Sequence, residues 1–143
     1  MRSVAWDLHW LVMAELVASR SKDPSTKTGA VIVSPQNIRV SDGYNGFPQR
    51  IKDDDRLNDR QLKYRMIVHC EMNAVLFARQ DLSGHTLYTW PFSSCDRCAV
   101  HMIQAGISRV VAPVNKEPRW EEALNFAINL FHEAGMEVTL YGD

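Results

Sequence analysis

The hydrophobic pattern predicts a helix near each end of the chain. From residue 2 to about residue 20, apolar side chains recur at steps of three and four, which predicts a helix with a wide buried face. Pro24 forbids its continuation. The same spacing from Trp120 to Ala134, followed by Gly135, predicts the clearest amphipathic helix. The apolar positions of the first helix are Val4, Trp6, Leu8, Trp10, Leu11, Val12, Met13 and Val17.

Short runs rich in apolar and β-branched residues predict five strands. Residues 28–34 and 38–44 flank the turn residues Pro35-Gln36-Asn37, and the pair is therefore expected to form a β-hairpin. Gly43-Tyr44-Asn45-Gly46 predicts a tight bend at the end of the second strand. Three more strands are expected at residues 86–89, 108–112 and 136–141.

Two further helices and one long connection separate the strands. Residues 70–80 are apolar almost all round, which predicts a central, buried helix. Residues 95–105 predict another helix, closed by Gly106. Residues 47–68 form a polar connection long enough to be an insertion or a functional loop. Its run Asp53-Asp54-Asp55 is interpreted as solvated charge rather than a cation site.

The order of these elements predicts the fold. After the hairpin, helices alternate with strands, so the later strands are expected to be parallel, with helices on both faces of the sheet. The predicted fold is α/β, a three-layer α/β/α sandwich with a central five-stranded mixed sheet. The 143 residues suffice for one domain with a substantial core, and we assign residues 1–143 to it.

Charge and cysteine usage narrow the classes of function. The chain has 16 basic and 17 acidic residues, a net charge of −1, which argues against a stable complex with nucleic acid. Charged residues interrupt the apolar segment 1–18, so it is expected to be neither a signal peptide nor a membrane span. The three cysteines are few, odd in number and clustered, which suits metal binding in the reducing cytoplasm.

Those cysteines lie in two short motifs, His69-Cys70-Glu71 and Cys95-Asp96-Arg97-Cys98. One imidazole and the two thiols of the second motif provide three zinc ligands, and a catalytic zinc keeps its fourth position open for water. Each motif opens a predicted helix, whose N-terminus favours thiolates. Zinc lowers the pKa of its bound water from about 15.7 to about 7, and Glu71 can then carry protons to the substrate. His-x-Glu followed by Cys-x-x-Cys is the zinc deaminase pattern.

Two less specific interpretations compete with a catalytic zinc site. A structural zinc would need a fourth protein ligand, for which Cys70, His85 and His101 are the candidates. The domain could also be a non-catalytic, zinc-stabilised binding module such as a nucleotide sensor. Glu71 argues against the binding module, because a structural site does not need that carboxylate. The joint occurrence of the two motifs, each opening a helix, argues against a structural zinc.

The chain resembles the deoxycytidylate (dCMP) deaminase family of the cytidine deaminase superfamily over nearly its whole length. Besides the two zinc motifs, the resemblance rests on Ser21-Lys22-Asp23-Pro24, Thr28-Gly29-Ala30-Val31, Gly43-Tyr44-Asn45-Gly46 with Pro48, Lys63-Tyr64, and Gln104-Ala105-Gly106-Ile107. It implies zinc-dependent hydrolysis of dCMP to dUMP and ammonia, which supplies dUMP for thymidylate synthesis. His69, Cys95 and Cys98 would hold the zinc ion, and Glu71 would be the proton shuttle.

The same resemblance implies where the substrate binds. Asn45 would hydrogen-bond the deoxyribose, and Thr28 and Ala30 are further candidates for substrate contact. Trp90 and Phe92 would stack on the base, although a role as core filler is equally compatible with their position. Three basic residues remain open as the 5′-phosphate contact: Arg50, Lys63 and Arg65.

Family members are commonly homo-hexamers that dCTP activates and dTTP inhibits, each nucleotide acting with Mg²⁺. By resemblance, Lys22, Gly43, Tyr44 and Gly46 are candidates for this allosteric nucleotide site.

Two departures from the family pattern concern Ser94 and Cys70. Ser94 stands directly before the first zinc cysteine, where the family usually has Pro, and Pro91 lies three residues earlier. Cys70 occupies a position where the superfamily often has Ala, and its thiol is expected to pack in the core. The main rival substrates are another cytosine nucleoside and adenosine in tRNA.

Overall fold

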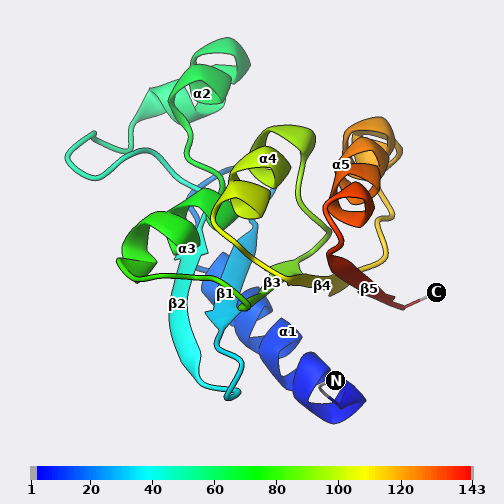
Figure 1. The fold of residues 1–143 in the computed structure, drawn as a ribbon. Helices are drawn as coiled ribbons and strands as arrows, with labels where there is room; N and C mark the ends of the chain where they lie inside the picture. Colours follow the sequence, from blue (N-terminus) through cyan, green and yellow to red (C-terminus); the bar gives the residue numbers. More distant parts are fainter. Residues whose placement is uncertain (1–2, 143) are drawn as a thin grey trace.

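The computed structural model describes residues 3–142, so residue 2, where the first helix was predicted to begin, lies outside the described part. Figure 1 shows the arrangement of the elements. The helices are α1 (Val4–Ala18), α2 (Arg60–Met66), α3 (Cys70–Ala78), α4 (Asp96–Gln104) and α5 (Glu121–Glu133), with 3-10 helices η1 (Asp55–Asn58) and η2 (Pro118–Trp120). The strands are β1 (Gly29–Val33), β2 (Arg39–Tyr44), β3 (Thr86–Trp90), β4 (Arg109–Pro113) and β5 (Glu137–Tyr141).

The five strands form one mixed sheet in the order β2-β1-β3-β4-β5. β1 and β2 form the predicted antiparallel hairpin, in which Gly29 lies opposite Tyr44. β1 is also antiparallel to β3, whereas β3, β4 and β5 run parallel to one another. The predicted five-stranded mixed sheet is therefore confirmed.

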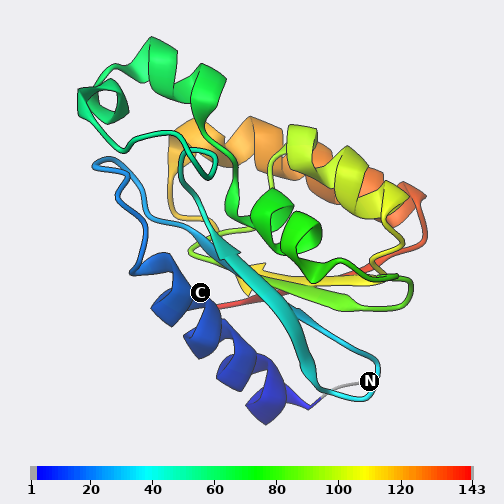
Figure 2. The same ribbon diagram turned by 90° about the vertical axis from the view of Figure 1, so that its left-hand side faces the viewer.

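Helices cover both faces of the sheet, which confirms the predicted three layers (Figure 2). Side chains alternate between the two faces of a strand. Val31 and Val33 of β1 therefore face α1, where they pack with Trp10. Ala30 and Ile32 point to the other face and pack in the core that includes residues of α3, α4 and α5.

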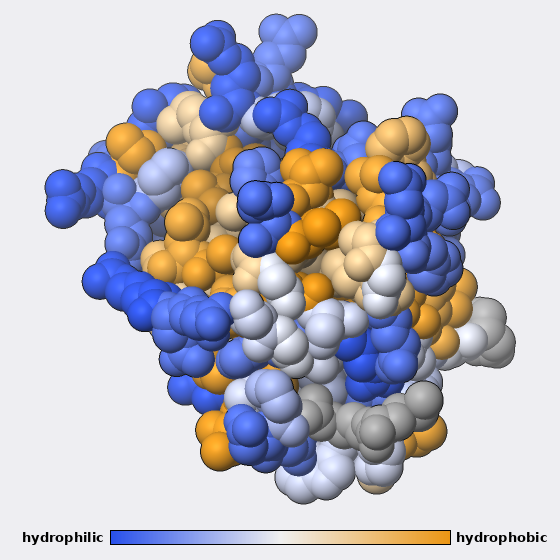
Figure 3. Space-filling model, viewed as in Figure 1, coloured by the Kyte–Doolittle hydropathy of each residue, from blue (hydrophilic) through white to orange (hydrophobic). Residues whose placement is uncertain are grey.

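The predicted burial of two helices is wrong in part. α3 buries Cys70, Glu71 and Ala74 but leaves Leu76 and Phe77 59% and 42% exposed, because it lies on one face of the sheet and contacts mainly the edge strand β2. Figure 3, viewed as Figure 1, shows hydrophobic side chains gathered on the surface over the side of the sheet that α3 and α4 cover. α1 likewise buries a narrow face of the predicted apolar set, and Val4, Trp6, Leu8 and Val12 remain exposed.

The connection 47–68 contains more structure than its polar sequence predicted. Asp54 and Asp59 accept hydrogen bonds from backbone N–H groups at the starts of η1 and α2, as N-cap residues do. The amphipathic signal of α2 is only seven residues long, too short to recognise by periodicity. α2 carries the buried Lys63 into the interior, so this connection helps to build the site described below.

A buried ionic cluster joins α1 to the sheet on the face opposite α3. Asp7 is fully buried, and its carboxylate accepts hydrogen bonds from Arg109 Nη1 at 2.8 Å and Nη2 at 2.7 Å. The hydroxyl groups of Tyr88 and Tyr141 also donate to it, at 2.8 Å and 2.6 Å. Burial raises the pKa of Asp7, but these four hydrogen bonds outweigh that effect and hold it below the usual value.

No described helix is long and apolar enough to cross a lipid bilayer.

Candidate active site

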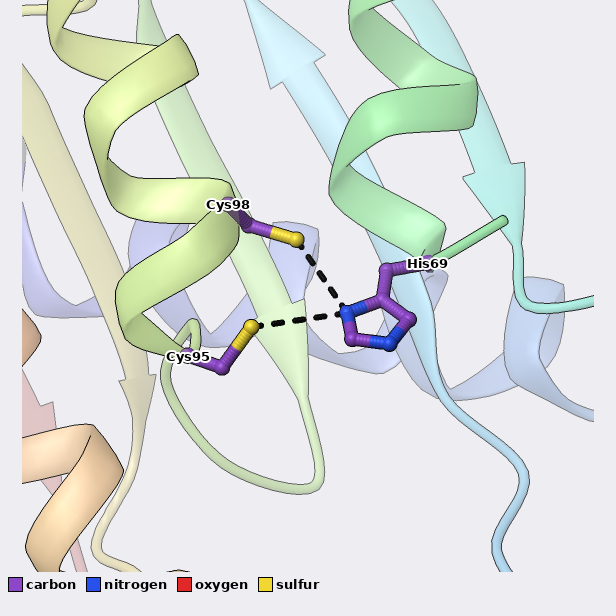
Figure 4. A group of neighbouring side chains, drawn as sticks. All are labelled: His69, Cys95 and Cys98. Carbon is purple, nitrogen blue, oxygen red and sulfur yellow. Dashed lines mark hydrogen bonds between the residues drawn. The ribbon is translucent and has the colours of Figure 1, made fainter. Parts of the chain in front are cut away.

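The first turns of two helices bring together the three predicted zinc ligands. His69 is the N-cap residue of α3, and Cys95 is the N-cap residue of α4, with Cys98 one turn later on the same helix face. The imidazole points between the two thiols, as Figure 4 shows, with Nδ1 3.2 Å from Cys98 Sγ and 3.4 Å from Cys95 Sγ. The isolated pairing of Gly46 with Val68 fixes the backbone just before His69.

The geometry of this group fits a zinc ion. Zinc bonds of about 2.3 Å to sulfur and about 2.0 Å to nitrogen, at a tetrahedral angle, place the two ligand atoms about 3.5 Å apart. The observed separations are slightly shorter, and the ligand atoms of all three residues lie within 4.8 Å of one another. Within residues 3–142, no fourth His, Cys, Asp or Glu joins the group. This favours an open fourth coordination position over the structural zinc considered above.

Electrostatics at the two sulfurs already favour a metal ligand. Hydrogen bonding with the Cys98 thiol lowers the pKa of Cys95 to about 4, and the His69 imidazole adds to this effect. Hydrogen bonding with Cys95 likewise raises the pKa of His69. The Cys95 thiolate in turn raises the pKa of Cys98. The negative charge thus lies on Cys95, and a divalent cation would stabilise a second thiolate at Cys98.

Glu71 and Cys70 occupy the buried first turn of α3 beside this group. Glu71 is 5% exposed, lines the adjoining cavity and is not part of the metal-binding group. Its position fits a proton carrier that does not bind the metal. The Cys70 thiol packs in the core, as predicted, and donates a hydrogen bond to Glu71 Oε1 at 3.0 Å. Cys70 therefore fixes the carboxylate rather than supplying a fourth metal ligand.

A cavity of about 110 Å³ opens onto His69, Glu71 and Cys95. Of the predicted substrate residues, Thr28, Asn45 and Phe92 line it, but Ala30 and Trp90 do not. Ala30 is fully buried in the core beneath α3. Trp90 ends β3 and packs against the hydrophobic cluster under α1, so the structure favours its alternative role as core filler. The remaining lining residues are Asp23, Ser25, Thr26, Lys63, Tyr64, Ile67, Cys70, Ser93, Arg119, Trp120, Ala123 and Leu124.

The buried side chain of Asn45 organises the cavity wall. Its Oδ1 accepts a hydrogen bond from the Thr28 backbone N–H at 2.9 Å, and its Nδ2 donates to Thr26 O at 2.9 Å and to Asp23 Oδ2 at 3.3 Å. Both amide N–H groups are therefore engaged within the protein. A contact from Asn45 to a sugar would have to use the second lone pair of Oδ1 or replace one of these bonds.

Of the three basic residues that were candidates for the 5′-phosphate contact, only one lies at the cavity. Lys63 lines the cavity, whereas Arg50 and Arg65 do not. Lys63 is 4% exposed and forms a buried ion pair with Asp23 at 3.0 Å, supported by Ser25 Oγ at 3.2 Å. Its charge is thereby neutralised inside the protein.

The predicted regulatory residues lie away from the cavity lining. Lys22 is exposed and pairs with Asp53 at 3.2 Å, and the Tyr44 side chain is 43% exposed. Gly43 has a packing role, because a Cβ there would lie 2.6 Å from the Ala74 backbone nitrogen in α3. Gly46 pairs with Val68, as described above.

Sequence reasoning missed the contribution of the segment around η2. Arg119, Trp120 and the start of α5 reach the cavity from a region that carries no recognisable motif. The aromatic rings of Phe92 and Trp120 lie 6.3 Å apart and form one side of the cavity. In the sequence, Trp120 is the first apolar position of the predicted C-terminal helix, and no local signal distinguishes it from a core residue.

The loop before Cys95 carries the departure from the family pattern. Ser94 is completely buried and Ser93 is 4% exposed, and neither hydroxyl has a hydrogen-bond partner within the described residues. Ser93 lines the cavity, so its hydroxyl is available to a bound molecule. Ser94 fills the position of the usual Pro within the protein interior.

Comparisons with known proteins agree with this site. Residues 4–114 match the model of the cytidine and deoxycytidylate deaminase zinc-binding region. The chain is 43% identical over 137 residues to a protein of Aliivibrio fischeri described as an uncharacterized deaminase in the luxG 3′ region, covering 94% of this chain and 92% of that protein. It is 36% identical over 138 residues to human deoxycytidylate deaminase, covering 92% and 76%.

A solved structure shares the fold over nearly the whole chain. The dCMP deaminase of the cyanophage S-TIM5, crystallised with dCMP and dUMP, superposes with a TM-score of 0.80 at 21% identity, covering 99% of this chain and all of that one. The family match spans both zinc motifs and Glu71. The chain therefore belongs to the cytidine and deoxycytidylate deaminase family of zinc-dependent hydrolytic deaminases.

Proposed function

We propose that this protein hydrolyses dCMP to dUMP and ammonia and so supplies dUMP for thymidylate synthesis. The observation that carries the proposal is one cavity lined by the zinc-ligating residues His69 and Cys95, the buried Glu71 and the aromatic rings of Phe92 and Trp120. Such a cavity suits a flat, polar-edged base held against an aromatic wall. Similarity to human deoxycytidylate deaminase supports dCMP as the substrate.

The roles of the residues follow from hydrolytic deamination. His69, Cys95 and Cys98 would hold a zinc ion, which when bound would supply a water that is nucleophilic at neutral pH. The new C–O bond forms at C4 of cytosine, and the bond from C4 to the amino nitrogen breaks. Glu71 would pass one proton of the attacking water to the ring nitrogen and then the second water proton, from the new C4 hydroxyl, to the amino group, which departs as ammonia. Phe92 and Trp120 hold the base.

Product analysis with three substrates tests this assignment. The protein is incubated separately with dCMP, cytidine and a tRNA anticodon stem, and dUMP, uridine, inosine and ammonia are measured. We expect dUMP and an equal amount of ammonia. Uridine or inosine without dUMP would overturn the substrate assignment in favour of a cytosine nucleoside or tRNA adenosine. The near-neutral charge of the chain disfavours the tRNA.

We further propose that the chain forms one domain over residues 1–143, acts in the cytoplasm and assembles as a homo-hexamer. The exposed hydrophobic side chains of α1 and α3 support self-association, since exposed apolar patches are typical of protein interfaces. The proposed allosteric site binds dCTP or dTTP with Mg²⁺ near Lys22, Gly43, Tyr44 and Gly46. Hydrogen bonds support coupling of this region to the cavity, because Ser21 Oγ donates to the backbone oxygen of Asn45 at 2.8 Å.

Replacing Lys22 by Ala should weaken the response to these nucleotides. Dependence of the rate on dCMP concentration is measured with dCTP and Mg²⁺, with dTTP and Mg²⁺, and with neither. We expect dCTP to activate the native protein and dTTP to inhibit it. Lys22→Ala should raise the concentration of either nucleotide that gives half of its maximal effect by about tenfold, because one cationic contact to phosphate is lost. Lys27→Ala, another exposed lysine of the same loop, is the control. A native rate indifferent to both nucleotides would contradict the regulatory proposal.

A further inference from the structure

Arg119 brings a positive charge to the cavity. It belongs to η2, its residue is exposed, and it is one of the residues that line the cavity. Apart from the proposed metal ligand His69, the basic residues of the lining are Lys63 and Arg119. Within residues 3–142, no ion pair neutralises Arg119, whereas Lys63 is paired with Asp23. Arg119 is therefore the cation that can bind an anionic group of a ligand.

Two contacts hold the guanidinium at the cavity. Its Cζ lies 4.8 Å from the centroid of the Trp120 ring, a cation–π contact that orients the planar group. Its Nη2 donates a weak hydrogen bond of 3.3 Å to Thr26 Oγ1 on the opposite loop. A guanidinium has five N–H donors, so most remain available for the oxygen atoms of a phosphate.

The surrounding wall supports a bound nucleotide at the same place. Trp120, which Arg119 overlies, also forms the aromatic wall with Phe92. The indole Nε1 of Trp120 and the hydroxyl of Ser93 are buried and lack a hydrogen-bond partner within the described residues. The aromatic wall, the unpartnered donors and the unpaired cation all belong to the lining of one cavity, which also includes Glu71.

We propose that Arg119 binds the 5′-phosphate of the substrate and makes the site selective for a nucleotide over the corresponding nucleoside. This inference rests on the proposed function, since it concerns the substrate of that same site. It replaces Arg50 and Arg65, which do not line the cavity, and Lys63, whose charge Asp23 already neutralises.

Kinetics of Arg119→Gln with dCMP and with deoxycytidine test the proposal. We expect kcat/KM for dCMP to fall about 10- to 100-fold, mainly through KM, as for loss of a charge-assisted hydrogen bond. The kcat/KM for deoxycytidine should stay within about threefold, because that substrate has no phosphate. Inhibition by dUMP should weaken by about the same factor as kcat/KM for dCMP falls. Inhibition by deoxyuridine should not change. Arg119→Lys, which keeps the charge, should recover part of the loss.

Lys116→Gln is the matched control, because Lys116 is an exposed cation of the same connection that does not line the cavity. Its kinetics should equal those of the native protein. If Arg119→Gln affects dCMP and deoxycytidine equally, or affects neither, Arg119 does not bind the phosphate. That result leaves the proposed function intact as long as the native protein converts dCMP to dUMP. A native protein that produces no dUMP would instead overturn the proposed function and this inference with it.

Discussion

Replacing Glu71 by Gln should lower kcat for deamination at least about 10²-fold and leave about one zinc ion bound per chain. Gln has nearly the same shape and can still accept the hydrogen bond of the Cys70 thiol, which Glu71 Oε1 now accepts at 3.0 Å. It cannot take a proton from water or deliver one to the leaving amino group. Because Glu71 is not in the metal-binding group, removal of its charge should not release the metal.

Initial rates of ammonia release and zinc content by elemental analysis measure the two expectations on the same preparation. Glu133→Gln, the same change at an exposed position of α5, should keep full activity. Full activity of Glu71→Gln would contradict its role as proton carrier. Parallel loss of zinc and activity would instead show that Glu71 acts by holding the metal site together.

The chemical part of the site could be predicted because it is local in sequence. His69 and Glu71 are two residues apart, Cys95 and Cys98 three apart, and each pair begins a helix. A helix start fixes the directions of neighbouring side chains, so residue type and spacing were sufficient to predict the zinc-binding group.

The binding part of the site depends on contacts that are distant in sequence. Arg119 meets Thr26 across 93 positions, and no repeating pattern records such a contact. Lys63 was one of three equivalent basic residues until the fold paired it with Asp23. From the sequence, Trp90 and Phe92 were equally good candidates for stacking on the base. Only the folded sheet separates them, because Trp90 packs under α1 whereas Phe92 lines the cavity.

Hydropathy gave the order of the elements and the mixed sheet, but not which helix face is buried. In α3 the apolar residues Leu76 and Phe77 are exposed, although a helix that is apolar almost all round was predicted to be buried. In α1 the fully buried residue Asp7 is charged, and it stands among apolar residues that are themselves exposed. Packing against a specific sheet decides which residues of a helix are buried. A charged side chain can be buried where the interior provides hydrogen-bond and ion-pair partners for it.

Replacing Asp7 by Asn should lower the free energy of unfolding by about 3–5 kcal/mol, the usual effect of removing one partner of a buried ion pair. The change leaves the Arg109 guanidinium, whose side chain is 10% exposed, without its bidentate carboxylate. The second carboxylate partner of Arg109, Glu137, is half exposed and screened by water, so it compensates only in part. The two tyrosine hydroxyls also lose their charged acceptor.

Acid should reduce the difference between the native protein and Asp7→Asn. The pKa of Asp7 is lower in the folded protein than the ordinary value of 3.8, so folding favours its ionised form. Its stabilising contribution is therefore complete above about pH 4 and is lost as the pH falls through the folded pKa. The two proteins should accordingly differ most near neutral pH and converge in strong acid, to the extent that both remain folded there.

Denaturant unfolding at several pH values measures this, with Asp42→Asn as the matched control. Asp42 also pairs with an arginine, Arg39 at 2.9 Å, but both side chains are more than 40% exposed. Its loss should cost about 1 kcal/mol or less, because exposed ion pairs contribute little. Since the Asp7 cluster lies on the face of the sheet opposite α3, folded Asp7→Asn should retain its zinc and its kcat. A cost for Asp7→Asn no larger than that for Asp42→Asn would mean that the buried cluster does not hold α1 against the sheet.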